Sequence, residues 1–138
     1  SGAMVQYLVE RYGNGKLQPE VGTADHALYL QWSWFAEATF SRPLGEVVNH
    51  GREFPDDKQI PEVVKEMKNR ASLSLDAVAD EVADKEYLIA NRFSAADIMM
   101  GYTIMLADRV LGKPLPKKIL PYWERLSERE GYQIAQKA

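Results

Sequence analysis

The most constraining feature of the sequence is a helix start at residues 93–98. Ser94 is followed three residues later by Asp97, which is the spacing of a capping box in an aspartate variant. Phe93 precedes the cap and Ile98 lies four positions into the helix, as in a hydrophobic staple. A strong helix is therefore predicted to begin at Ser94, with Asp97 as a buried structural partner of the backbone rather than an acid–base catalyst.

Four further helices follow from apolar residues that recur at spacings of three and four. No stretch shows the alternation of apolar and polar side chains that is typical of a strand. The chain is therefore predicted to be an all-α bundle of five helices. The expected ranges are 1–12, 23–49, 61–84, 94–111 and 118–129, with a short helical turn in the tail from 131 to 138.

The helix expected at 23–49 is apolar over most of its girth. Such a helix lies centrally in a bundle or contacts two partners at once. Trp32 and Trp34 point about 200° apart on a helix, so we expect one indole in the core and the other facing a pocket or another domain. Pro43 is expected to bend or break the helix, because proline removes a backbone donor and clashes with the preceding turn.

Composition excludes several classes of function. The 138 residues fit one domain, and 17 basic against 20 acidic residues give a net charge of -3, which argues against a nucleic-acid partner. The absence of cysteine excludes disulfides and thiolate catalysis by this chain. The longest apolar run, residues 98–107, is too short to span a bilayer, and no signal-peptide pattern is present, so we expect a cytoplasmic protein without a membrane partner. His26 and His50 are isolated, so no metal site is expected.

Two stretches resemble one known family. Residues 87–98, YLIANRFSAADI, resemble the YL-x-G-x-x-FS-x-ADI signature of the glutathione S-transferase C-terminal domain. Upstream, Leu73, Leu75 and Asp76 are similar to the L-x-x-LD run that leads into this signature. The resemblance implies an all-helical domain of the bacterial type.

Two more matches extend the resemblance toward the N-terminus. Residues 29–43, YLQWSWFAEATFSRP, resemble the first helix of that domain in bacterial members. Residues 1–19, SGAMVQYLVERYGNGKLQP, are similar to the ES-x-AI-x-x-YL-x-x-RYG-x-x-x-L-x-P segment that joins the two halves of these proteins. The four matches occur in the family's order and cover nearly the whole chain.

The resemblance implies a division of the chain into three parts. Residues 1–15 correspond to the last helix of the family's thioredoxin-like domain, residues 16–22 to the linker, and residues 23–138 to the helical domain. The rest of the thioredoxin-like half, which in the family carries the catalytic Tyr, Ser or Cys and most glutathione contacts, has no counterpart in these residues. No catalytic residue is therefore expected within the chain, and the chain by itself is expected to be inactive.

The sequence departs from the family pattern in its turns. Ala90 stands where the family usually has glycine, and Asn91 is expected to take the left-handed conformation instead, because asparagine tolerates it. Residues 130–132, EGY, stand where Arg-Pro-x-Tyr is common, which affects only the geometry of the tail.

Ser1 is the one glutathione contact that the resemblance implies for this chain. It corresponds to the serine of the family's Glu-Ser pair, which holds the γ-glutamyl carboxylate of glutathione at a helix N-terminus, where free N–H groups favour anions. A second interpretation is that Ser1–Met4 is a remnant of an expression vector. The uninterrupted family register through these residues favours the native interpretation.

Candidate substrate-binding residues lie in and after the second predicted helix. Thr39, Ser41 and Arg42 align nearest the family's electrophile site, and Trp34 is the candidate for the indole that faces the pocket. Arg42 has two interpretations: its guanidinium pairs with a carboxylate of glutathione or of an acidic substrate, or it is a solvated surface charge.

The resemblance supports two functions of different classes. In the first, the parent protein is a homodimeric enzyme that conjugates glutathione, its co-substrate, to an apolar electrophile, and this half binds the electrophile. In the second, the chain belongs to a non-catalytic interaction module, a use that this fold also has. The residue that distinguishes the two is the thiol activator, which lies outside these residues.

Overall fold

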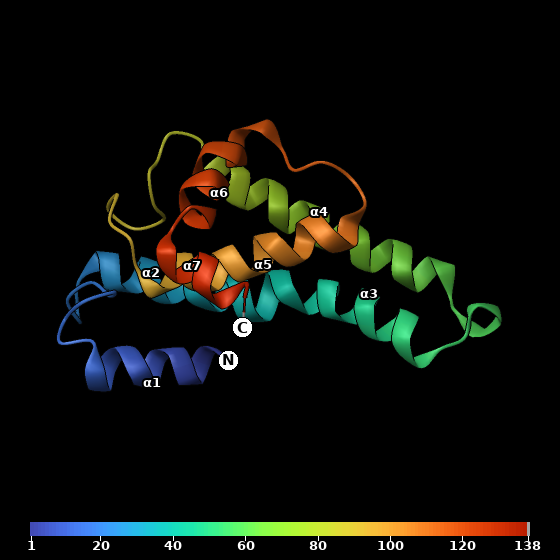
Figure 1. Ribbon diagram of the computed structural model, residues 1–138, viewed down its shortest axis with the longest axis horizontal. Helices are drawn as coiled ribbons and strands as arrows, with labels where there is room; N and C mark the ends of the chain where they lie inside the picture. Colours follow the sequence, from blue (N-terminus) through green and yellow to red (C-terminus); the bar gives the residue numbers. More distant parts are fainter. Residues whose placement is uncertain (138) are drawn as a thin grey trace.

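The computed structural model describes residues 1–137, and within them the chain is helical without a named strand (Figure 1). The all-α prediction is therefore confirmed, whereas the predicted count of five helices is too low. The α-helices are α1 (Gly2–Tyr12), α2 (Ala24–Trp34), α3 (Ser41–Glu53), α4 (Pro61–Glu81), α5 (Ala95–Leu111), α6 (Leu120–Ser127) and α7 (Glu130–Ala135). The helix predicted at 23–49 is divided into α2 and α3, and the tail forms α7 rather than a single turn.

The chain does not break at Pro43. A π-helical turn, Phe35–Phe40, joins α2 directly to α3, and Pro43 lies within the first turn of α3. In this turn the Ser41 N–H bonds to the carbonyl of Ala36, five residues back. The wider turn precedes the proline, so the irregularity that we expected at Pro43 falls one turn earlier and the helix continues past it.

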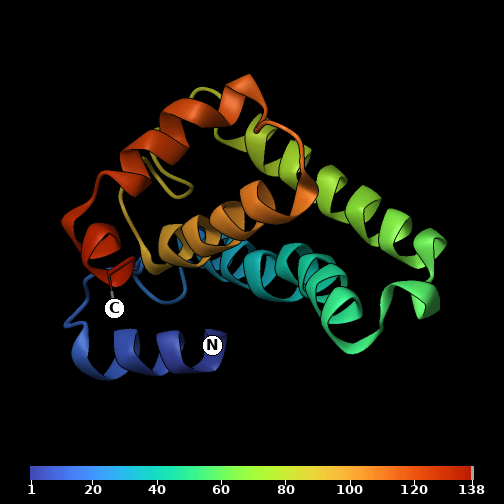
Figure 2. The same cartoon turned by 45° about the vertical axis from the view of Figure 1, so that its right-hand side comes forward.

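Helix α5 forms the centre of the bundle (Figures 1 and 2). It packs against α2, the π-helical turn, α3, α4 and α6, and most of its residues are buried. The helices α3 and α4 pack along each other and project together at the end of the molecule away from α1 (Figure 2). The core therefore lies around α5, and the α3–α4 pair extends from it.

Helix α1 lies at the edge of the molecule in both views (Figures 1 and 2). Val9 is its only buried residue. Four large side chains on its outer side, Met4, Tyr7, Leu8 and Tyr12, are each more than half exposed. The bundle therefore does not cover the whole apolar surface of the first helix.

The turn before α5 is strained at two positions. Ala90 and Asn91 both have positive φ, 48° and 52°, and the flanking residues Ile89 and Arg92 form a bridge across the turn. Two successive left-handed residues describe a type I′ turn. The expectation that Asn91 alone replaces the family glycine is therefore incomplete, because Ala90 also adopts the left-handed conformation, in which its Cβ is crowded.

Candidate functional site

The carboxylate of Asp97 is the most highly connected polar group in the bundle. It is fully buried and accepts hydrogen bonds from Ser94 N (2.8 Å), Ser94 Oγ (2.9 Å) and Leu88 N (3.0 Å). Tyr122 Oη, from α6, donates a fourth at 2.9 Å. The capping box at the start of α5 is present, and the same carboxylate also ties the preceding loop and α6 to it.

Tyr122 is the member of this cluster that the sequence analysis did not identify. It is 1% exposed, and burial raises the pKa of its hydroxyl well above the usual 10.0, with the Asp97 charge acting in the same direction. Tyr122 therefore stays neutral, and its hydroxyl donates a hydrogen bond to the carboxylate. The two residues are 25 positions apart, so no local spacing in the sequence predicts the contact.

A second carboxylate occupies the start of α1. Glu37, from the π-helical turn, accepts hydrogen bonds from Ser1 Oγ (2.6 Å) and Gly2 N (3.1 Å) at one oxygen. Its other oxygen accepts from the Ser1 amino group at 3.1 Å. The Ser1 hydroxyl, together with these backbone donors, lowers the pKa of Glu37 below its usual 4.5. The residue that sequence analysis assigned to a glutathione carboxylate thus contacts a carboxylate of the protein itself.

An open groove of about 870 Å³ runs between α3 and α4 and gathers two of the four predicted substrate residues, Thr39 and Arg42. Its lining includes apolar side chains, among them Pro43, Val63 and Met67. A volume of this order is typical of small-molecule sites. The full lining of this α3–α4 groove is Ala38, Thr39, Arg42, Pro43, Glu46, His50, Val63, Met67, Arg70, Leu73 and Ser74.

The charges of the α3–α4 groove form exposed pairs on each wall. Arg42 bonds to Glu46 at 2.8 Å on α3, and Arg70 bonds to Glu66 at 2.8 Å on α4. The Arg42 side chain is 74% exposed. Exposed pairs of this kind contribute little energy, so Arg42 is free to exchange Glu46 for another anion.

The other two predicted substrate residues lie elsewhere. Trp34 is 51% exposed and lies beside Gly2 and Val5 of α1, whereas Trp32 is buried, so the two indoles divide between core and surface as expected. Ser41 donates its hydroxyl to the carbonyl of Glu37 at 2.9 Å, within its own helix, and does not line the groove. The four residues therefore do not form one constellation.

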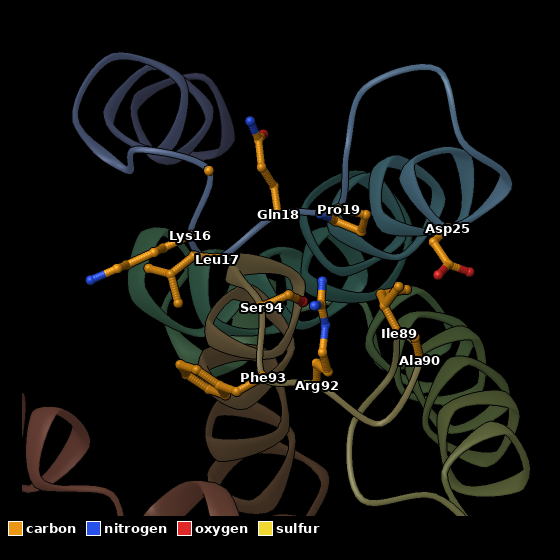
Figure 3. Close-up of a pocket in the computed structure, with 11 residues that line it drawn as sticks. Lys16, Leu17, Gln18, Pro19, Asp25, Ile89, Ala90, Arg92, Phe93 and Ser94 are labelled. Carbon is orange, nitrogen blue, oxygen red and sulfur yellow. The ribbon is translucent and has the colours of Figure 1, made fainter.

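A smaller cavity of about 340 Å³ lies between the 15–19 linker and the 89–94 loop (Figure 3). Lys16, Asp25 and Arg92 line it, but Figure 3 shows their charged ends pointing away from one another. The linker is fixed there by the bond from Ala95 N to the carbonyl of Leu17 at 2.8 Å. This contact gives the left-handed Leu17 a structural role in fixing the linker at the start of α5.

The two histidines occupy structural positions. Nε2 of His50 accepts the N–H of Ile60 at 2.8 Å, and His26 stacks on Tyr29. Among residues 1–137 no group of three or more His, Asp or Glu side chains is arranged to hold a metal ion. Within the same residues, no helix is both long and apolar enough to cross a membrane.

The known proteins to which this chain is similar are glutathione transferases. The chain is 29% identical to glutathione S-transferase 3 of Schizosaccharomyces pombe, over 98% of this chain and 60% of the relative. No family model matches the sequence. The chain therefore spans about three fifths of the length of this curated relative.

Solved structures agree on the fold. A glutathione transferase from Methylococcus capsulatus superposes with a TM-score of 0.79 at 26% identity, covering 99% of this chain and 64% of that one. Ure2p5 from Phanerochaete chrysosporium, cocrystallized with 1-(S-glutathionyl)-2,4-dinitrobenzene, gives 0.86 at 17% identity, covering 99% and 66%. The glutathione S-transferase-like character inferred from the sequence motifs is thus confirmed.

Proposed function

We propose that this chain, a helical domain of the glutathione S-transferase type, supplies the electrophile-binding half of an enzyme that conjugates glutathione to apolar electrophiles. The observation that carries the proposal is the similarity to a protein named glutathione S-transferase over 98% of the chain. The α3–α4 groove supports it, because its size and the apolar side chains in its lining suit a small apolar substrate.

In the proposed reaction the glutathione thiolate attacks an electrophilic carbon of the substrate. A carbon–sulfur bond forms, and the leaving group departs with its bonding electron pair. No residue of this chain carries a thiol. A thioredoxin-like half, preceding Ser1 in the whole protein, would stabilise the thiolate, while this half holds the electrophile in line for attack.

We assign residues 1–15 to the last helix of that thioredoxin-like half, residues 16–22 to the linker and residues 23–138 to the helical domain. The peripheral place of α1 supports the assignment, because only Val9 of this helix is buried. Met4, Tyr7, Leu8 and Tyr12 would then pack on the rest of the thioredoxin-like half.

Ser1 is proposed to bind a carboxylate of glutathione. The donors at the start of α1 suit that group, since Ser1 Oγ and Gly2 N already bond a carboxylate, that of Glu37. Binding of glutathione at these donors therefore requires Glu37 to give up its bonds to them. We expect Ser1→Ala to weaken glutathione binding by the whole protein.

Thr39 and Arg42 are proposed to contact the electrophile in the α3–α4 groove, and Trp34, which lies beside α1, and Ser41 are two further proposed substrate contacts. The test is the turnover of 1-chloro-2,4-dinitrobenzene by the whole protein with glutathione. Arg42→Gln is expected to raise KM for the electrophile several-fold. Arg52→Gln, an equally exposed arginine of α3 outside the groove, serves as the control and should leave KM unchanged. Absence of turnover with several classes of electrophile would contradict the enzymatic proposal.

The chain alone is proposed to be inactive, because the family's thiol activator has no counterpart in these residues, the chain has no cysteine, and Ser1 is its single proposed glutathione contact. Purified residues 1–138 should show no specific turnover of 1-chloro-2,4-dinitrobenzene and glutathione. Clear conjugation by this chain would overturn the assignment of the thiol activator to the preceding half.

The exposed face of α1 also bears on association. We propose that the parent protein is a cytoplasmic homodimer and that the isolated chain self-associates through Met4, Tyr7, Leu8 and Tyr12, since large exposed apolar patches are rare on monomers. Light scattering should show an oligomer that Leu8→Glu dissociates. An inactive whole protein that binds another protein specifically would instead favour the non-catalytic interaction module.

A further inference from the structure

The buried side chains of α2, the π-helical turn and α3 follow a period of four. Trp32, Ala36, Phe40 and Leu44 all lie in the core. In a regular α-helix, each residue rotates the chain by roughly 100°. The twelve steps from position 32 to position 44 therefore exceed three full turns by about 120°, and the two side chains would point in different directions. The π-helical turn absorbs this difference, and it allows all four side chains to remain in one core.

The same turn decides which side chains of α3 face α4. Thr39 lies within the turn, and Arg42 and Glu46 follow it on the groove wall. Removing one residue from the turn would rotate α3 by roughly 100° relative to α2. Either Leu44 would then leave the core, or Arg42 and Glu46 would leave the groove.

Thr103 of α5 contacts this turn from the centre of the bundle. Its hydroxyl is buried and donates to the carbonyl of Met99 at 3.1 Å and to that of Ala36 at 3.4 Å. The carbonyl of Ala36 is the acceptor of the five-residue bond from Ser41 N–H. The hydroxyl therefore contacts a carbonyl that accepts one of the five-residue bonds of the π-helical turn.

We propose that the π-helical turn sets the electrophile specificity of the α3–α4 groove and that Thr103 is the positioning residue that holds it. This rests on the proposed function of the groove. Thr103 does not line the groove; it acts through Ala36 and Ser41 on the placement of Thr39 and Arg42. Single-turn π-helical segments within α-helices are frequent at functional sites, which agrees with this role.

The first arm of the test uses hydrogen exchange on the 138-residue chain and needs no enzyme activity. Thr103→Val removes the hydroxyl and keeps the branched shape, so the Ser41 amide should exchange about fivefold faster, as expected for the loss of one hydrogen bond. Thr103→Ser keeps the hydroxyl and should exchange as the natural protein does. Ser72→Ala, which removes a hydroxyl bonded only to its own helix, is the control and should leave Ser41 unchanged.

The second arm uses the whole protein with 1-chloro-2,4-dinitrobenzene. Thr103→Val should raise KM for the electrophile about fivefold and leave kcat within about twofold, whereas Thr103→Ser restores KM. Deletion of Ala38, which shortens the turn, should change the ranking of electrophiles by KM.

The outcomes separate this proposal from the function on which it rests. An inactive whole protein would reject the proposed function, and the exchange rates would still decide whether Thr103 holds the turn. An active protein in which Thr103→Val changes neither the exchange of Ser41 nor KM would overturn this proposal while leaving the proposed function intact.

Discussion

A carboxylate lies at the start of both α5 and α1, but the two sites are built differently. At α5, Asp97 belongs to the helix that it caps, is fully buried and accepts four hydrogen bonds. At α1, Glu37 comes from another element, its side chain is 31% exposed, and two of its three donors belong to Ser1. A hydrogen-bonded carboxylate therefore stabilises the fold at the start of α5, whereas at the start of α1 another anion can replace it.

The difference follows from the dielectric surroundings of the two groups. A buried donor that loses its acceptor costs about 1–3 kcal/mol, because no water replaces the lost partner. At an exposed site water takes over the bonds, and an ion pair there contributes about 1 kcal/mol or less. Variants at the two sites should therefore differ several-fold in their effect on the free energy of unfolding.

The largest effect is expected for Asp97→Ala. It leaves the N–H groups of Leu88 and Ser94 and the hydroxyl of Tyr122 without their acceptor in the core. We expect a loss of about 3–5 kcal/mol in the free energy of unfolding, measured by urea denaturation. Asp76→Ala, an exposed aspartate of α4, is the control and should change stability by less than about 0.5 kcal/mol. If Asp97→Ala unfolds at the same urea concentration as the natural chain, Asp97 does not anchor the fold.

Tyr122→Phe and Ser94→Ala sharpen the comparison within the α5 site. Each removes one hydroxyl donor and leaves three bonds to Asp97. A hydrogen bond to a charged group is worth about 1.5–3 kcal/mol, so we expect roughly 1.5 kcal/mol for Tyr122→Phe. For Ser94→Ala we expect about 1 kcal/mol, the typical value of a helix cap. Urea melts of both single variants measure the two values, and a loss for Ser94→Ala that exceeds that of Asp97→Ala would contradict the assigned roles.

Tyr122 also gives the α5 site a pH dependence at the alkaline end. Its pKa in the folded chain lies above the unfolded value of 10.0. The unfolded chain therefore loses this proton first, so the contribution of Tyr122 is complete below pH 10.0 and falls as the pH rises toward the folded pKa. Stability measured between about pH 9 and 11 should fall less steeply in Tyr122→Phe than in the natural chain.

Ala90→Gly tests the loop that carries Leu88 to Asp97. Ala90 has a φ of 48°, which costs an L-residue with a Cβ roughly 1–2 kcal/mol, and glycine adopts this conformation freely. After the entropy that glycine loses on folding, we expect a gain of about 0.5–1 kcal/mol. The gain appears as a higher urea midpoint with an unchanged slope. Destabilisation by Ala90→Gly would mean that the Ala90 methyl makes contacts that outweigh its strain.

The smallest effect is expected for Glu37→Gln at α1. The pKa of Glu37 lies below its unfolded value of 4.5, so its contribution is present above pH 4.5 and is lost as the pH falls through the folded value. Because the side chain is partly exposed, we expect less than about 1 kcal/mol at pH 7. Urea melts at pH 7 and pH 3 should differ less for Glu37→Gln than for the natural chain. An effect as large as that of Asp97→Ala would remove the contrast between the two sites.

The same contrast explains what the sequence could predict. The spacing of Ser94 and Asp97 is local, so the sequence predicts the start of α5. The division of Trp32 and Trp34 between core and surface is predictable for the same reason, because the two residues lie close together in one helix. The contacts of Asp97 with Tyr122 and of Glu37 with Ser1 join residues 25 and 36 positions apart, and no local pattern marks them.

The π-helical turn is an intermediate case. The missing N–H of proline led us to predict a bend or break at Pro43. In the structure the irregularity lies at residues 35–40, where it keeps the side chains on both sides of the turn in the core. The spacing of exactly four between Trp32, Ala36, Phe40 and Leu44 was a readable signal of an underwound helix. Of the candidate substrate residues, Thr39 and Arg42 share a groove because both lie on the α4 side, while the Ser41 hydroxyl donates to the carbonyl of Glu37.

The most direct test of the central claim is amide hydrogen exchange along the isolated chain. The α5 site is complete within this chain, whereas α1 buries only Val9, so the account predicts that α5 amides exchange at the rate set by global unfolding. The amides of α1 should exchange many-fold faster, through local opening that leaves the bundle folded. Protection of residues 5–12 equal to that of residues 99–111 in a monomeric chain would contradict the account, because the bundle would then hold α1 without any partner.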